Sequence, residues 1–121
     1  MDLQISARPG RACTVVRVSG DLDMDTTPML EDFLRDVMDA GARRVVLDFA
    51  GVTFMDSSGL GLLVLSLKRL GVIGGRLSLA DVQEPVRNVL VRSAVDTVLD
   101  VYDTVAAAED DMPTLAPESV R

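Results

Sequence analysis

The hydrophobic and polar residues of the chain form an opening stretch with a strand-like period and then segments of helical and strand-like period in turn. Apolar residues at positions 3, 5 and 7, turn residues at 8–11 and β-branched residues at 13–19 predict an opening β-hairpin. A near-continuous apolar run at residues 45–49 predicts the central strand, buried on both faces. Two more strands are predicted at residues 76–80 and 98–102.

Helix-length segments separate the later strands. The first helix is predicted to start with Thr27 as its cap and Pro28 in its first turn, and to stop at Gly41, with apolar positions 30, 33, 34 and 37 on one face. A second helix has apolar positions 60, 63, 64, 67 and 70 and ends near cationic positions 68 and 69. Pro85 begins a third helix, and residues 104–108 predict a final helical turn.

The order of these elements predicts an α/β fold in a single domain. Strands and helices alternate in the way that implies right-handed crossovers and a mixed, mostly parallel β-sheet of about five strands with four helices packed on it. We assign residues 1–108 to this domain. Residues 109–121 combine acids and two prolines without an apolar period, so we expect a disordered tail there.

Charge and cysteine content restrict the partners and the compartment. The formal net charge of −7 should repel phosphate backbones and anionic lipid, so we expect no direct nucleic acid and no membrane partner. Cys13 is the single cysteine, which excludes an internal disulfide and fits the reducing cytoplasm. The start of the chain lacks a signal-peptide pattern, and the apolar stretch at residues 60–65 is too short to span a bilayer.

Catalytic and cofactor motifs find little support in the sequence. The chain has no histidine, so a Ser-His-Asp triad cannot form, and positions 55–59 do not match the nucleophile-elbow pattern. Positions 59–64 lack the third glycine of a dinucleotide fingerprint, and no P-loop occurs. The acids at positions 21, 23 and 25 lack the rest of an EF-hand, which favours solvated turn acids. We expect no enzyme activity, no cofactor and no metal.

One polar segment stands before the second helix: Phe-Met-Asp-Ser-Ser-Gly-Leu-Gly at residues 54–61. Asp56 or Ser57 can cap that helix by accepting from its free N–H groups. Gly59 and Gly61 each cost a helix interior about 0.5–1 kcal/mol relative to Ala, which indicates a close approach to the backbone. Residue chemistry leaves two interpretations equally weighted: simple caps with tight packing, or a functional site whose hydroxyl could carry a phosphate.

With these residues the chain resembles the STAS-domain anti-sigma factor antagonists of bacteria. The resemblance is carried by Gly-Asp-Leu-Asp at residues 20–23, Val-Val-Leu-Asp at residues 45–48 and Phe-Met-Asp-Ser-Ser-Gly-Leu-Gly at residues 54–61. By element order it extends over residues 1–108. It implies a STAS fold.

The resemblance also implies a phosphorylation switch. In that family, a partner that is both anti-sigma factor and serine kinase phosphorylates the serine that directly follows the aspartate, which corresponds to Ser57 here. The unphosphorylated antagonist binds the anti-sigma factor and frees the sigma factor. The phosphorylated form dissociates, and a phosphatase acting on the phosphoserine resets it.

Neighbouring residues have supporting roles under this resemblance. Asp56 would help present the acceptor serine to the kinase, and Ser58 would shape or cap the helix start and is the weaker candidate acceptor. Gly59 and Gly61 would let the partner or the sheet come close. Asp23 would lie on the same face, either as a partner contact or as an exposed turn acid.

Two alternatives remain open. The chain could be a STAS signalling module whose partner is a phosphatase or sensor other than an anti-sigma kinase. It could also be a small enzyme or ligand-binding protein that uses Asp56 and Ser57. In each case we expect a monomer or a weak dimer.

Overall fold

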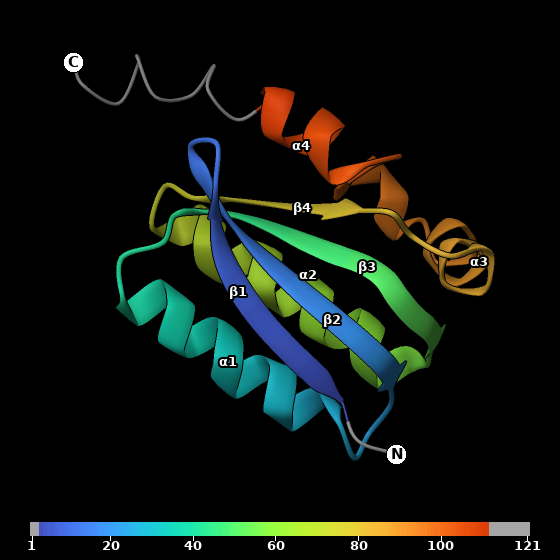
Figure 1. Cartoon of the computed structure of the whole chain (residues 1–121). Coiled ribbons are helices and arrows are strands. Elements are labelled where there is room, and N and C mark those ends of the chain that lie inside the picture. Colours follow the sequence, from blue (N-terminus) through green and yellow to red (C-terminus); the bar gives the residue numbers. More distant parts are fainter. Residues whose placement is uncertain (1–2, 112–121) are drawn as a thin grey trace.

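The computed structural model describes residues 3–111, and its elements follow the predicted order (Figure 1). Besides a short 3-10 helix at Val95–Thr97, the elements are β1 (Gln4–Gly10), β2 (Cys13–Leu22), α1 (Thr27–Asp39), β3 (Arg44–Met55), α2 (Ser57–Val72), β4 (Arg76–Ala80), α3 (Glu84–Arg92), β5 (Asp100–Tyr102) and α4 (Val105–Asp111).

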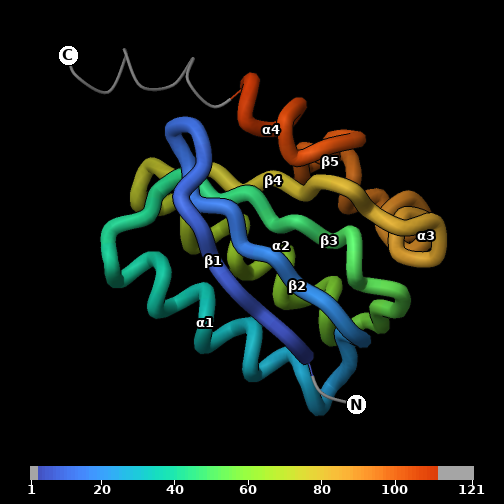
Figure 2. Tube along the Cα trace, viewed as in Figure 1, coloured from blue at the N-terminus to red at the C-terminus, as the bar shows by residue number. Residues whose placement is uncertain are grey.

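The five strands form one mixed sheet in the order β1-β2-β3-β4-β5 (Figure 2). β1 pairs antiparallel with β2, and every later pair is parallel. The sheet is therefore mostly parallel with the opening hairpin at one edge, which confirms the predicted fold class. This arrangement brings the ends of β2 and β3 together at one edge of the molecule.

The main core lies on one face of the sheet, where α1, α2 and α3 bury their apolar sides (Figure 1). Inward-facing residues of β2, β3 and β4 meet leucines and valines of these helices, including Leu30, Leu63 and Leu90. On the other face, α4 covers a smaller cluster of Val15, Val46, Ala80 and Ala108. Helices therefore cover both faces of the parallel strands, as buried strands of this kind require.

The opening hairpin turns later than predicted. β1 continues through Gly10, and the turn consists of Arg11 and Ala12 rather than residues 8–11. Pro9 is tolerated within β1 because this strand lies at the edge of the sheet, where a missing N–H need not break a ladder. The turn chemistry was therefore assigned too early in the sequence.

β3 is longer than the predicted 45–49 segment because β2 continues beside it. The two strands pair from Thr14 opposite Val45 to Leu22 opposite Met55, with register shifts on the way. Conversely, β5 starts at Asp100 rather than at residue 98, because the chain first makes a 3-10 turn. The long β3 carries the polar segment to the carboxyl end of the parallel strands.

α1 ends where the sequence predicts, but it begins with a different cap residue. α1 ends near Gly41, whose φ of +108° suits glycine, as predicted for the stop. At the other end the N-cap is Thr26, not Thr27, and its side chain makes no cap hydrogen bond. The Thr26 hydroxyl instead donates to the carbonyl of Asp21 at 2.7 Å, which ties down the loop before the helix.

The last helix continues past the predicted boundary at Ala108. Residues 109–111 are helical, although disorder was expected to begin at 109, and Glu109 is buried. Its carboxylate accepts from the backbone N–H of Arg11 at 2.8 Å, and the hydroxyl of Tyr102 donates to Asp111 at 2.6 Å. These acids have partners elsewhere in the fold, which a search for apolar periods cannot detect. The rest of the predicted tail, residues 112–121, lies outside the described residues.

Candidate functional site

The loops after β2 and β3 lie next to each other. The backbone N–H of Asp56 donates to the carbonyl of Leu22 at 3.0 Å, and Leu22 is the register partner of Met55. Asp23 directly follows Leu22, so the structure brings the Gly-Asp-Leu-Asp and Asp-Ser-Ser-Gly segments to the same edge. Two motifs that are more than thirty positions apart in the sequence thus form one surface.

Asp56 is the cap of α2. Its carboxylate accepts from the backbone N–H groups of Ser58 at 2.8 Å and Gly59 at 3.4 Å, and its backbone is extended. Of the two caps considered from the sequence, Asp56 and Ser57, the structure selects Asp56. Ser58 lies within the first turn and contributes a backbone donor to this cap.

Ser57 is the first residue of α2 and is exposed. Its hydroxyl makes no hydrogen bond with any residue in the part of the chain that the structure describes. The hydroxyl next to the capping carboxylate is therefore accessible to a macromolecular partner. Ser58 is half-buried and less accessible.

The two glycines of α2 have different surroundings. A Cβ atom on Gly59 would lie 2.6 Å from Cγ of Met55 and 3.1 Å from Cβ of Leu22, so this glycine lets the helix approach the sheet. A Cβ atom on Gly61 would meet nothing within 4 Å, and the residue is exposed. Packing against the sheet explains Gly59 and leaves Gly61 unexplained within the chain.

Asp23 organises the loop beside this helix start. Its carboxylate accepts from the backbone N–H groups of Asp25 at 2.9 Å and Thr26 at 3.0 Å. These bonds form an Asx-type turn, which fixes the position of the acid and leaves it half-buried. Asp23 therefore has a local structural role at the same edge as Asp56.

Two exposed apolar side chains belong to the same two segments and were not singled out from the sequence. Met24, in the Asp23 loop, is 74% exposed, and Phe54, just before the cap of α2, is 49% exposed. Phe54 lies opposite Asp21 in the strand register, which places the two segments side by side. Sequence periodicity gave no sign of this exposure, because Phe54 lies in a β-strand beside core residues.

Other reactive groups lie away from this edge. Burial raises the pKa of the Cys13 thiol above its ordinary value, and the nearby Glu109 carboxylate raises it further, which disfavours the reactive thiolate. Among residues 3–111, no three carboxylate, thiol or imidazole groups come together as a metal site. No helix in this part of the chain has both the length and the apolar character needed to cross a membrane.

Nearly the whole chain is similar in sequence to known proteins. A family model described as the STAS domain matches residues 4–108. An anti-sigma F factor antagonist of Paenibacillus polymyxa is 35% identical over 108 residues, which cover 85% of this chain and 89% of that protein. The sequence similarity thus extends across nearly the whole described fold.

Solved structures agree with this match. An anti-sigma factor antagonist from Mycobacterium paratuberculosis has a TM-score of 0.84 at 25% identity and covers 93% of this chain and 95% of its own. The antagonist SpoIIAA in its unphosphorylated form has a TM-score of 0.78 at 25% identity, covering 92% and 97% of the two chains. The phosphorylated form of SpoIIAA from Bacillus shares the fold, with a TM-score of 0.66 at 23% identity and coverage of 98% and 100%. The chain therefore belongs to the STAS domain family.

Proposed function

We propose that this protein is an anti-sigma factor antagonist whose binding to its partner is switched off by phosphorylation of Ser57. The observation that carries the proposal is the exposed Ser57 hydroxyl at the start of α2, directly beside the capping Asp56. Its relatives support this function: the matched Paenibacillus polymyxa protein is an anti-sigma F factor antagonist, and SpoIIAA has been solved in unphosphorylated and phosphorylated forms.

The geometry of the cap supports a switch based on charge. A phosphoryl group on Ser57 would add about −1.5 to −2 charges next to Asp56. The N–H groups of Ser58 and Gly59 already donate to Asp56, so they are not free to neutralise the phosphate. The added charge stays at the surface and repels an acidic or apolar partner face, without any rearrangement of the domain.

The partner surface in this proposal combines an apolar centre with acidic neighbours. Met24 and Phe54 provide exposed apolar contacts, and Asp23 and Asp56 belong to the same two adjacent segments. Large apolar side chains near the centre of an interface supply most of its binding energy. The unphosphorylated face is therefore suited to a partner with an apolar pocket. Phosphate on Ser57 would place negative charge at the edge of this face.

The phosphorylation site is tested with a candidate anti-sigma factor kinase from the genome that encodes this chain, supplied with ATP. Mass spectrometry of the wild type, Ser57→Ala and Ser58→Ala is expected to find phosphate on the wild type and on Ser58→Ala only. Phosphate that appears undiminished on Ser57→Ala would falsify the assignment.

The switch is tested separately by binding. Ser57→Asp is expected to weaken the complex with the anti-sigma factor, because it introduces charge at the same place. Ser57→Ala is expected to bind like the unphosphorylated wild type and to stay bound when ATP is added. If Ser57→Asp and phosphorylated wild type bind as tightly as the unphosphorylated protein, the charge mechanism is wrong.

The alternative partners predict a different outcome. A STAS module that serves a phosphatase or sensor would bind that protein and show no affinity for any anti-sigma factor. A small enzyme would need a base for Ser57, yet the Asp56 carboxylate is directed to the backbone N–H groups of Ser58 and Gly59. The antagonist function is therefore the one that the site supports best.

A further inference from the structure

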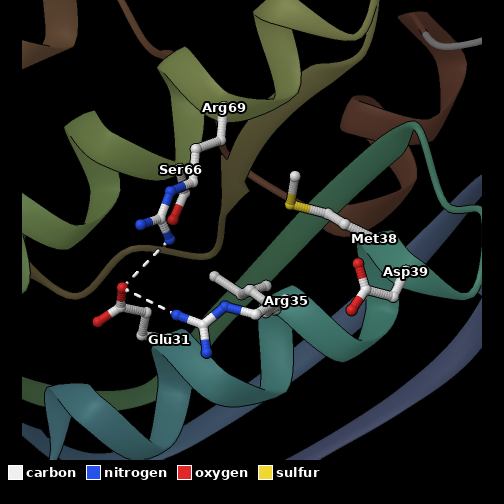
Figure 3. A pocket seen from close by; sticks show the side chains of 7 residues that line it. Glu31, Arg35, Met38, Asp39, Ser66 and Arg69 are labelled. Carbon is white, nitrogen blue, oxygen red and sulfur yellow. Dashed lines mark hydrogen bonds and ion pairs between the residues drawn. The ribbon is translucent and has the colours of Figure 1, made fainter.

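A separate groove lies between α1 and α2, away from the Ser57 edge (Figure 3). It has a volume of about 330 Å³, at the small end of the range for small-molecule sites. Four charged side chains, two apolar ones and one hydroxyl line it: Glu31, Leu34, Arg35, Met38, Asp39, Ser66 and Arg69. It thus combines an apolar floor with charges of both signs.

Ser66 is the most unusual residue of this groove. It is only 4% exposed, it lines the groove from α2, and its hydroxyl makes no hydrogen bond with any residue between 3 and 111. The hydroxyl oxygen itself is not fully buried, unlike that of Ser78, so a water or a ligand in the groove can reach it. A ligand that bonds Ser66 replaces such a water.

The charges of the groove are only partly paired with one another. Glu31 is the shared partner of two arginines: its carboxylate lies 3.3 Å from Arg35 and 3.1 Å from Arg69 (Figure 3). A guanidinium group has five N–H donors, so both arginines keep donors for a ligand. Asp39, at the other end of the groove, makes no ion pair or hydrogen bond within the described residues.

The mixture of positive and negative side chains in the groove restricts the charge of the ligand. A net anion would face the carboxylates of Glu31 and Asp39, and a net cation would face the guanidinium groups of Arg35 and Arg69. A small zwitterion avoids both repulsions, because its carboxylate can lie against arginine and serine donors while its ammonium group lies near a free carboxylate. The apolar floor adds room for an aliphatic side chain.

We propose that the α1–α2 groove binds a free amino acid with an aliphatic side chain. Its carboxylate accepts from Ser66 and Arg69 on α2, its ammonium group donates to Asp39 on α1, and its side chain packs on Leu34 and Met38. The site does not include Ser57, so this inference is independent of the proposed phosphorylation switch.

The test uses the full chain labelled with ¹⁵N, titrated with L-leucine up to ~10 mM, a range that covers weak metabolite binding. Saturable shifts of the amide resonances of Met38, Ser66 and Arg69 are expected. The matched probes are 4-methylpentanoate, which lacks the ammonium group, and 3-methylbutylamine, which lacks the carboxylate. Each is expected to bind at least about tenfold more weakly, because each loses one charge-assisted contact.

Variants locate the site. Arg69→Met and Asp39→Asn are each expected to weaken leucine binding about tenfold, whereas Lys68→Met and Asp36→Asn, which change charges outside the groove, are expected to leave it unchanged. The proposal is overturned if leucine causes no saturable shift at the groove. It is overturned equally if both single-charge probes bind as well as leucine, or if the control variants weaken binding as much as the groove variants.

Discussion

The carboxylate of Glu109 accepts a hydrogen bond from the backbone N–H of Arg11 at 2.8 Å, across 98 positions of the sequence. This bond joins the last helix to the tip of the opening hairpin, and Glu109 is only 9% exposed. Removing the carboxylate leaves a backbone donor without its partner. We expect Glu109→Ala to lower the free energy of unfolding by about 1–3 kcal/mol in urea denaturation.

Two variants serve as controls for Glu109. Glu109→Gln keeps an oxygen that can accept the same bond and should retain most of the stability. Asp110→Ala removes only an exposed ion pair with the Arg11 side chain, so a loss of less than about 1 kcal/mol is expected. If Glu109→Ala and Asp110→Ala lower the free energy of unfolding equally, the buried hydrogen bond of Glu109 contributes no more to stability than the exposed ion pair of Asp110.

The two glycines of α2 should respond in opposite directions to the same substitution. Gly59→Ala forces a methyl group against Met55 and Leu22, so we expect a loss of about 1–3 kcal/mol in the free energy of unfolding. Gly61→Ala enters open space in a helix and should add about 0.5–1 kcal/mol. Thermal or urea unfolding of both variants measures the contrast, and destabilisation by Gly61→Ala would contradict it.

Tyr102 allows a pH prediction, because it is the one tyrosine of the chain. Burial and, next to it, the hydrogen bond to Asp111 together raise its pKa from 10.0 to about 12. The ultraviolet absorbance of the phenolate should therefore show a midpoint near 12 in the folded protein. Asp111→Asn should lower that midpoint.

The same shift has a consequence for stability. The folded state holds the phenol proton more tightly than the unfolded state, so this contribution is fully present below pH 10 and is lost as the pH rises from 10 towards 12. Urea midpoints measured across this range should fall with pH, and Tyr102→Phe should show a weaker decline. An identical decline in both proteins would exclude Tyr102 as the cause.

Phe54 is expected to contribute to partner binding more than to folding. Because the side chain is 49% exposed, Phe54→Ala should change the unfolding temperature little. It should lower the affinity for the anti-sigma factor by about tenfold, since an aromatic anchor at an interface is typically worth more than 1 kcal/mol. Isothermal titration calorimetry provides the measurement.

Val72→Ala is the matched control for Phe54. Val72 is an apolar residue that is 86% exposed, but it lies at the far end of α2 from Ser57. Its substitution should leave partner affinity unchanged. If both substitutions weaken binding alike, the contact surface extends along the whole helix rather than around its start.

Most elements could be predicted from local patterns, and two of the misplaced ends have a common cause. The strand at residues 76–80 was predicted with its observed bounds because its alternation depends only on consecutive residues. The hairpin turn and the end of β3 differ from the prediction because each depends on pairing with a neighbouring strand. β5 starts later than predicted because a 3-10 turn precedes it. Pairing can extend a strand through residues such as Pro9 and Gly51, which sequence rules assign to turns.

The order of the elements, the α/β class and the motif that places Ser57 after a buried strand and before a helix can all be read from local patterns in the chain. Periodicity and turn chemistry act between residues close in the chain, so they are readable there. Three further features follow from the tertiary structure: Asp56 is the cap, Gly59 is needed for packing, and Glu109 is buried. The tertiary structure also brought Asp23 beside Asp56 and formed the α1–α2 groove, because burial and pairing depend on segments far apart in the sequence.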